Sequence, residues 1–115
     1  MSDSTELFDL SAMQEMADGC GWSLAEFVNL YLTNTHKEMA RLSEAVRDGN
    51  GVERKRLAHG IAGSSATAGV IGMVPILRTI EHAEEDADVP ALMQAAGDRF
   101  NAVEAALISR SARDA

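Results

Sequence analysis

Several residue types are scarce in this chain, and each shortage excludes a class of protein. Cys20 is its one cysteine, so no disulfide forms within the chain, and a reducing cytoplasm is the expected compartment. No apolar run approaches the roughly 20 residues of a membrane span, and no basic-then-apolar leader segment is visible. Positive charge is scarce too: 10 Lys and Arg stand against 18 Asp and Glu, a net charge of −8. That balance disfavours proteins whose main ligand is nucleic acid or an anionic membrane.

The composition that remains favours one helical domain. A chain of 115 residues, 46% of them hydrophobic, can bury one core of ordinary size without metals or disulfides. Aromatic residues make up only 4%, whereas alanine, leucine and methionine are plentiful, which favours helices over sheets. We expect a single domain over residues 1–115, with frayed ends at 1–7 and 109–115.

Apolar residues recur at steps of three and four in five segments, and period-two alternation typical of strands is absent. Ser23 and Glu26 have the spacing of a capping box, and Gly69 suits the residue that ends a helix. Pro75 and Pro90 fit the first turns of helices. The expected helices span about 9–18, 24–46, 52–68, 73–85 and 90–108. Together they predict an all-α fold, an antiparallel up-down four-helix bundle with a short additional N-terminal helix.

The helix expected at 52–68 carries the residues of chemical interest. At about 100° per residue, His59 lies opposite the apolar stripe and is expected to be exposed. A glycine within a helix costs stability, so Gly63, one turn after His59, indicates that another protein approaches the ring closely. The surface C-terminal to the imidazole is expected to carry the small residues Ala62, Gly63 and Ala66, and Val52 is also expected near the ring. The apolar stripe itself comprises Leu57, Ile61, Ser64 and Ala68.

The segment 57–70, LAHGIAGSSATAGV, resembles the motif of histidine-containing phosphotransfer (HPt) domains. In that family the phosphorylated histidine is followed by a Lys-Gly-Ser/Ala segment and, ten residues after the histidine, by another glycine. The matching positions are Ala58, His59, Gly63, Ser64, Ser65 and Gly69, continued by Met73, Leu77, Ile80 and Glu81. The resemblance covers nearly the whole chain, because a short helix followed by a four-helix bundle is also the family's order.

The resemblance implies a phosphorelay carrier, in which His59 accepts a phosphoryl group from a receiver-domain aspartate and passes it to another. A neutral imidazole is nucleophilic near pH 7, and the family implies Nε2 as the attacking nitrogen. The implied protein is not an enzyme: it has no kinase or ATP site and no cofactor, and Mg²⁺ belongs to the receiver. The implied partners are receiver domains of response regulators and of hybrid histidine kinases, met by a free-standing monomer.

One position departs from the motif, because Ala62 stands where the family usually has lysine. Lys55 and Arg56, one turn before His59, are candidates to supply the missing positive charge, and Lys55 shares the azimuth of that lysine. The alternative is that both are simply solvated surface. The missing lysine also leaves open a second function, a non-phosphorylated adaptor that binds or sequesters a receiver or kinase.

The remaining candidates are expected to have structural roles. Glu81 is expected to anchor the bundle or to orient neighbouring polar groups. His36 and His82 are expected at solvent-facing or boundary positions. A metal-binding bundle is a third possibility, disfavoured because the chain has no Glu-x-x-His or His-x-x-x-His pair. We therefore expect no metal site.

Overall fold

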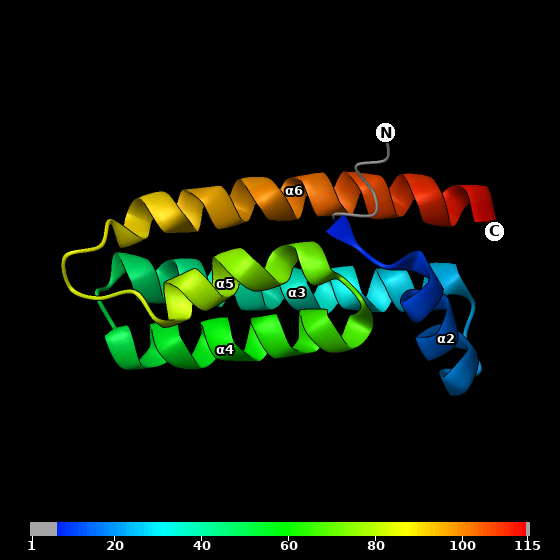
Figure 1. Ribbon diagram of the computed structural model, residues 1–115, viewed down its shortest axis with the longest axis horizontal. Coiled ribbons are helices and arrows are strands. Elements are labelled where there is room, and N and C mark those ends of the chain that lie inside the picture. Colours follow the sequence, from blue (N-terminus) through cyan, green and yellow to red (C-terminus); the bar gives the residue numbers. More distant parts are fainter. Residues whose placement is uncertain (1–6, 115) are drawn as a thin grey trace.

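The computed structural model describes residues 7–114, with side chains as far as residue 112. Its elements are α2 (Leu10–Cys20), α3 (Leu24–Arg47), α4 (Gly51–Ala68), the 3-10 turn η1 (Ile71–Met73), α5 (Val74–Glu81) and α6 (Val89–Asp114). Figure 1 shows α3, α4, α5 and α6 alternating in direction along the long axis, with α2 at one end. Residues 7–114 contain no strand, and the predicted all-α bundle with a short additional N-terminal helix is confirmed.

The helix starts follow the capping signals in the sequence. The Ser23 hydroxyl accepts a hydrogen bond from the Glu26 amide at 3.1 Å, and the Glu26 carboxylate accepts one from the Ser23 amide at 2.8 Å. Asp9 and Asn50 cap α2 and α4 through their side-chain oxygens in a similar way. Each contact satisfies an N–H group that a helix start leaves without a partner.

The segment after α5 differs from the sequence-based expectation. α5 ends at Glu81 rather than near residue 85. Arg54 of α4 donates hydrogen bonds to the carbonyl oxygens of Ile80 and Ala83, which satisfies the end of α5 from a neighbouring helix. The acidic run 84–86 also disfavours continuation, because negative charge is unfavourable at the carboxyl end of a helix.

Within the described residues, α6 continues beyond residue 108, where the sequence predicts its end. Residues 109–114, expected to fray, continue α6 as far as Asp114, and Ser111 is buried among them. Leu7, at the start of the described chain, is buried as well. Residues 1–6 and 115, the rest of the predicted frayed ends, lie outside the described residues.

The buried face of α4 is rotated relative to the predicted one. Ser65 is fully buried, with its hydroxyl 2.8 Å from the Tyr31 hydroxyl of α3, whereas Ser64, predicted in the core, is exposed. Ala58 and Ala62 are fully buried, so Ala62 does not belong to the open surface of the helix. The rotation arises because α4 packs on both α3 and α5, and small side chains allow a close approach between helices. A helical wheel that considers mainly large apolar residues does not predict that α4 buries a second face, which is made of small residues.

Two glycines end helices in the left-handed conformation. Gly21, with φ of 74°, ends α2 slightly later than predicted, and Gly69, with φ of 90°, ends α4 as predicted. Gly69 also joins α4 to α2, because its carbonyl accepts a hydrogen bond from the Asp9 amide at 2.7 Å. A Cβ at Gly69 would lie 3.2 Å from the Asp9 carbonyl oxygen and 3.1 Å from the Met13 side chain. This motif glycine therefore serves the fold.

We expect Gly69→Ala to lower the free energy of unfolding by about 2–3 kcal/mol, because left-handed backbone strain adds to crowding against α2. Urea unfolding followed by circular dichroism measures the loss. Gly49→Ala is the matched control: Gly49 has φ of 69°, but a Cβ there would meet nothing within 4 Å. It should show the strain alone, about 1 kcal/mol. Equal losses for the two variants would contradict the role of the Asp9 contact.

Candidate functional site

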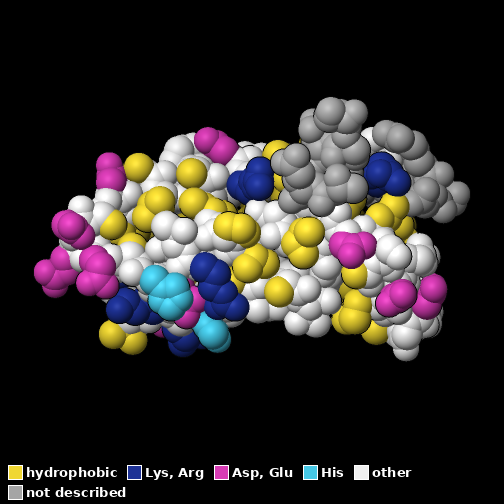
Figure 2. All heavy atoms as spheres, viewed as in Figure 1, with side chains coloured by type: hydrophobic (Ala, Val, Ile, Leu, Met, Phe, Trp, Pro, Cys, Tyr) yellow, Lys and Arg dark blue, Asp and Glu magenta, His cyan; other side chains and the backbone are white. Residues whose placement is uncertain are grey.

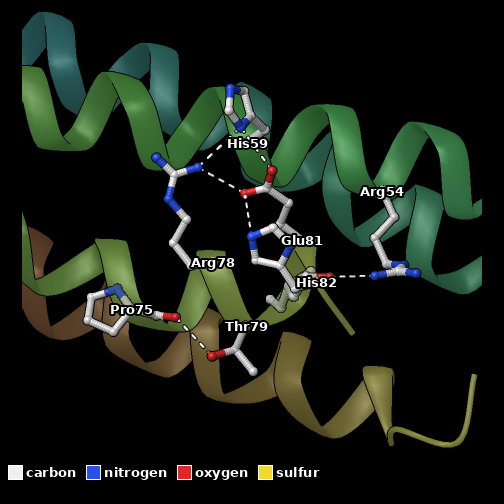
Figure 3. Close-up of polar contacts among 8 residues, drawn as sticks. Arg54, His59, Pro75, Arg78, Thr79, Glu81 and His82 are labelled. Atoms are coloured by element: carbon white, nitrogen blue, oxygen red, sulfur yellow. Dashed lines mark hydrogen bonds and ion pairs between the residues drawn. The ribbon is translucent and has the colours of Figure 1, made fainter. Parts of the chain in front are cut away.

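An exposed histidine on α4 is met by two charged side chains from α5. The His59 side chain is 67% exposed, and its Nδ1 lies 2.9 Å from Glu81 Oε2. Arg78 Nη1 lies 3.2 Å from the same nitrogen and donates a hydrogen bond to Glu81 Oε1 at 2.9 Å. Figure 3 shows both side chains reaching across from α5 to the ring. Nδ1 is therefore engaged, whereas Nε2, on the far side of the ring, points away from both partners.

The network determines which ring nitrogen carries the proton. The hydrogen bond from Arg78 is the main cause that lowers the pKa of Glu81, so this carboxylate is ionised at neutral pH and can only accept. A carboxylate oxygen at 2.9 Å from Nδ1 therefore requires a hydrogen on Nδ1. A protonated Nδ1 cannot accept from Arg78, whose hydrogen-bonding partner is then Glu81. The lone pair of His59 is left on Nε2.

The local structure of α5 holds this network in place. Arg78 and Glu81 lie three residues apart, so both side chains leave the same face of the helix. Leu77 and Ile80, which adjoin them in sequence, are fully buried and fix the neighbouring face of the helix in the core. Arg54 secures the carboxyl end of the helix through the Ile80 carbonyl oxygen. The Glu81 side chain is only 15% exposed, so its carboxylate is held more firmly than that of a typical surface glutamate.

The surface of α4 on the other side of the histidine is open, as the small residues there predict. Gly63 lies one turn beyond His59, and a Cβ added at Gly63 would meet nothing within 4 Å. Ala66 is exposed. Ala62, predicted on this surface, instead lies buried, as described above. The open strip therefore comprises Gly63 and Ala66.

The positive charge closest to the ring is not the one that the sequence indicates. Lys55 is exposed, and Arg56 is bound to Glu53 at 2.6 Å, a pairing that lowers the pKa of that carboxyl. Among the described residues, no hydrogen bond joins either cation to His59. Arg78 lies 3.2 Å from the ring, although it is not among the residues predicted from the sequence. The signal that was present is its spacing of three residues from the motif glutamate.

An apolar groove borders the open strip between α2, α3 and α4. Two of its large apolar side chains are notably exposed, Met16 at 37% and Leu30 at 42%. Its lining comprises Met16, Phe27, Leu30, Tyr31, Asn34, Thr35, Gly63, Ser64, Thr67 and Ala68. Gly63 belongs to both the groove and the surroundings of the histidine. A modest apolar patch beside an exposed polar centre suits a transient protein partner.

Charge is distributed unevenly over this face. Figure 2 shows histidine side chains with several lysine and arginine side chains beside them over α4 and α5, while acidic side chains gather at the left-hand end of the molecule and others lie toward the opposite end. The left-hand end holds the acidic loop between α5 and α6. The surroundings of the site are therefore locally positive although the chain carries a net charge of −8.

The two other histidines are exposed, as predicted. His36 Nε2 lies 2.8 Å from Glu104 Oε2 of α6, and its ring stands edge-on to Phe100. His82 follows the network, with its Nε2 at 3.8 Å from Glu81 Oε1. Among the described residues, no group of three or more His, Cys, Asp or Glu side chains is placed to hold a metal ion. Nor does that part of the chain contain a helix both long and apolar enough to cross a membrane.

Comparison with known protein families finds a match that covers most of the chain. The sequence model of the Hpt domain matches residues 26–109, which include most of α3, all of α4 and α5, and most of α6. No curated protein and no solved structure matches the chain. Hpt domains are phosphoryl carriers, not kinases, that act through a histidine in two-component relays. The matched region contains His59, Arg78 and Glu81, and the chain belongs to the Hpt domain family.

Proposed function

We propose that this chain is a cytoplasmic, monomeric phosphorelay intermediate that accepts a phosphoryl group on His59 Nε2. The donor is the aspartyl phosphate of one receiver domain, and the acceptor is the aspartate of another. The observation that carries the proposal is the contact between His59 Nδ1 and the Glu81 carboxylate, which leaves a lone pair on the exposed nitrogen. The exposed thiol of Cys20 suits a reducing compartment.

The transfer balances without a base or a metal ion from this chain. Nε2 of the neutral imidazole attacks phosphorus, the Nε2–P bond forms, and the bond from phosphorus to the aspartate oxygen breaks. The electron pair of that bond returns to the aspartate as a carboxylate. Nδ1 keeps its proton throughout, so the phosphorylated ring is a cation, and the Glu81 carboxylate stabilises it. We place the Mg²⁺ that screens the phosphoryl oxygens in the acidic pocket of the receiver.

The apolar groove is the surface on which we place the receiver. It adjoins the histidine through Gly63, so a partner seated there can reach Nε2 without crossing a large side chain. The groove is small, and such contacts give weak, rapidly exchanging complexes, at best of about micromolar affinity. A relay that must pass through two successive partners needs this rapid exchange.

Gly63→Leu should separate docking from folding. The substitution adds a side chain between the groove and His59, and we expect transfer to slow about tenfold or more because the receiver cannot approach. The fold should become about 0.5–1 kcal/mol more stable, since leucine is the better helix former. Gly97→Leu, in the middle of α6, is the control: it makes the same change where a Cβ meets nothing within 4 Å. Normal transfer by Gly63→Leu would show that the receiver docks elsewhere.

The proposal is tested with receiver domains that carry a radiolabelled aspartyl phosphate in the presence of Mg²⁺. We expect the label to move to this chain in an acid-labile, base-stable form, and then to a second, unlabelled receiver. Receiver binding is measured separately by calorimetry. Binding to receivers without any transfer would overturn the proposal in favour of the non-phosphorylated adaptor that Ala62 left open.

A further inference from the structure

Arg78 occupies an unusual position for a surface arginine. Its Nη1 lies within 3.2 Å of the phosphoacceptor ring and 2.9 Å from Glu81, yet its side chain is still 38% exposed. Its pairing with Glu81 explains how that carboxylate is held, but the exposed part of the guanidinium is screened by solvent and adds little to stability. Its place beside the reacting ring points to a further role.

The Arg78 guanidinium has N–H groups that are not used in the network with Glu81 and His59. The hydrogen bonds of Arg78 to described residues use Nη1 alone, so the N–H groups on Nη2 and Nε have no acceptor among those residues. A guanidinium presents five N–H groups in a planar fork that matches the oxygens of a phosphoryl group. Because Nη1 lies on the Nδ1 side of the ring, Arg78 has to turn its remaining N–H groups toward a phosphoryl group on Nε2, and its partly exposed side chain leaves room for that movement.

The other candidate positions for a cation are less suitable. Ala62, one turn from His59, is fully buried, so a lysine there would need different packing around α4. Arg56 is held by two hydrogen bonds from its guanidinium to Glu53. Lys55 is exposed on α4 and does not reach the ring in the described structure. Of the cations near the site, Arg78 is the one already in place.

We propose that Arg78 is the residue that neutralises the phosphoryl group on His59, acting from α5 through its free N–H groups. This inference rests on the proposed function of the site. The phosphoryl group brings about two negative charges, and the ring beneath it becomes a cation that Glu81 already balances. Arg78 then favours the phosphorylated chain over the phosphorylated receiver. No bond beyond those of the transfer itself forms or breaks.

The decisive quantity is the equilibrium constant for transfer between the receiver and this chain, because docking affects both directions of transfer equally and cancels. For Arg78→Ala we expect the equilibrium to shift about tenfold toward the phosphorylated receiver, the effect of losing one charge-assisted hydrogen bond at a half-exposed site. Arg78→Lys should recover part of the loss. If Arg78 only held Glu81 in place, its removal would free that carboxylate for the ring, and the equilibrium would not move toward the receiver.

Three variants complete the design. Arg47→Ala removes an arginine that is also paired with a glutamate three residues away, Glu44 at 3.9 Å on α3, but is more exposed than Arg78, and it should leave the equilibrium unchanged. Lys55→Ala tests the alternative cation, and a larger shift with Lys55→Ala than with Arg78→Ala would overturn the proposal. Arg78→Gln keeps a donor for Glu81 without the charge, so it gives the answer if Arg78→Ala folds poorly. Thermal melts of all variants establish which are folded.

A second measurement does not need a receiver. The chain is phosphorylated with phosphoramidate, and the phosphorus resonance is followed by NMR as the pH changes. A cation on the phosphoryl oxygens makes the last phosphoryl proton leave at lower pH in the wild type than in Arg78→Gln. If the wild type is phosphorylated but its phosphoryl group titrates at the same pH as in Arg78→Gln, the role of Arg78 is overturned while the proposed function stands. Failure of both phosphoramidate and phosphorylated receivers to phosphorylate the wild type would overturn the proposed function and this inference with it.

Discussion

His59→Gln is expected to abolish phosphoryl acceptance completely. Glutamine has a similar reach but no nucleophilic nitrogen, and neither of the other two histidines is followed one turn later by a glycine, as His59 is by Gly63. Because the His59 side chain is 67% exposed, the free energy of unfolding should change by no more than about 0.5 kcal/mol. The measurement is label transferred from a phosphorylated receiver, together with a thermal melt that shows the variant to be folded.

The matched control for this substitution is His36→Gln, which removes an exposed histidine bound to Glu104 on the α3–α6 side. It should accept phosphate at the wild-type rate. Residual acid-labile label on His59→Gln would place the acceptor elsewhere and would contradict the account of the site.

Glu81→Ala is expected to slow transfer roughly 100-fold, the scale of loss when a reacting group is no longer held in its productive orientation. Without the carboxylate, the His59 ring is free to rotate and to place its proton on Nε2, where it blocks the lone pair. The developing positive charge on the ring also loses its partner. A time course of quenched reactions at saturating receiver concentration measures the rate of transfer separately from docking.

Glu81→Gln separates the hydrogen bond from the charge. The amide has one oxygen, whereas Arg78 and Nδ1 of His59 both need an acceptor, so this variant should fall between the wild type and Glu81→Ala. Because Arg78 lowers the pKa of Glu81, the carboxylate stays ionised at every pH above the ordinary glutamate value of about 4.3. We therefore expect the ionisation of Glu81 to cause no change in the transfer rate between pH 5.5 and 8. Wild-type rates for both variants would show that Glu81 only anchors the bundle.

Much of the fold could be predicted because local signals and the global architecture agree. The capping box at Ser23 and Glu26 and the left-handed Gly69 each depend on residues close in sequence, and both lie where predicted. The end of α5 was predicted wrongly, because Arg54, which satisfies its carbonyl oxygens, comes from another helix. Local pattern contains no information on such a contact.

In the site, too, the features that depend on one helix could be predicted, and those that depend on contacts between helices could not. His59 and Gly63 could be found from the sequence, because exposure and open space follow from positions on one helix. Arg78 could not be assigned, since its contact with the ring depends on how closely α5 packs against α4. That packing depends on buried alanines, and the same alanines led the helical wheel to place Ser64 rather than Ser65 in the core.

The most direct test of the account is to identify the phosphorylated atom. The chain is labelled with ¹⁵N on its histidines, phosphorylated, and examined by NMR for coupling between phosphorus and a ring nitrogen. We expect coupling to Nε2 of His59, with a proton retained on Nδ1, and in the unphosphorylated chain we expect the Nδ1–H form of the ring. Coupling to Nδ1 of His59, or to either nitrogen of His36 or His82, would contradict the account.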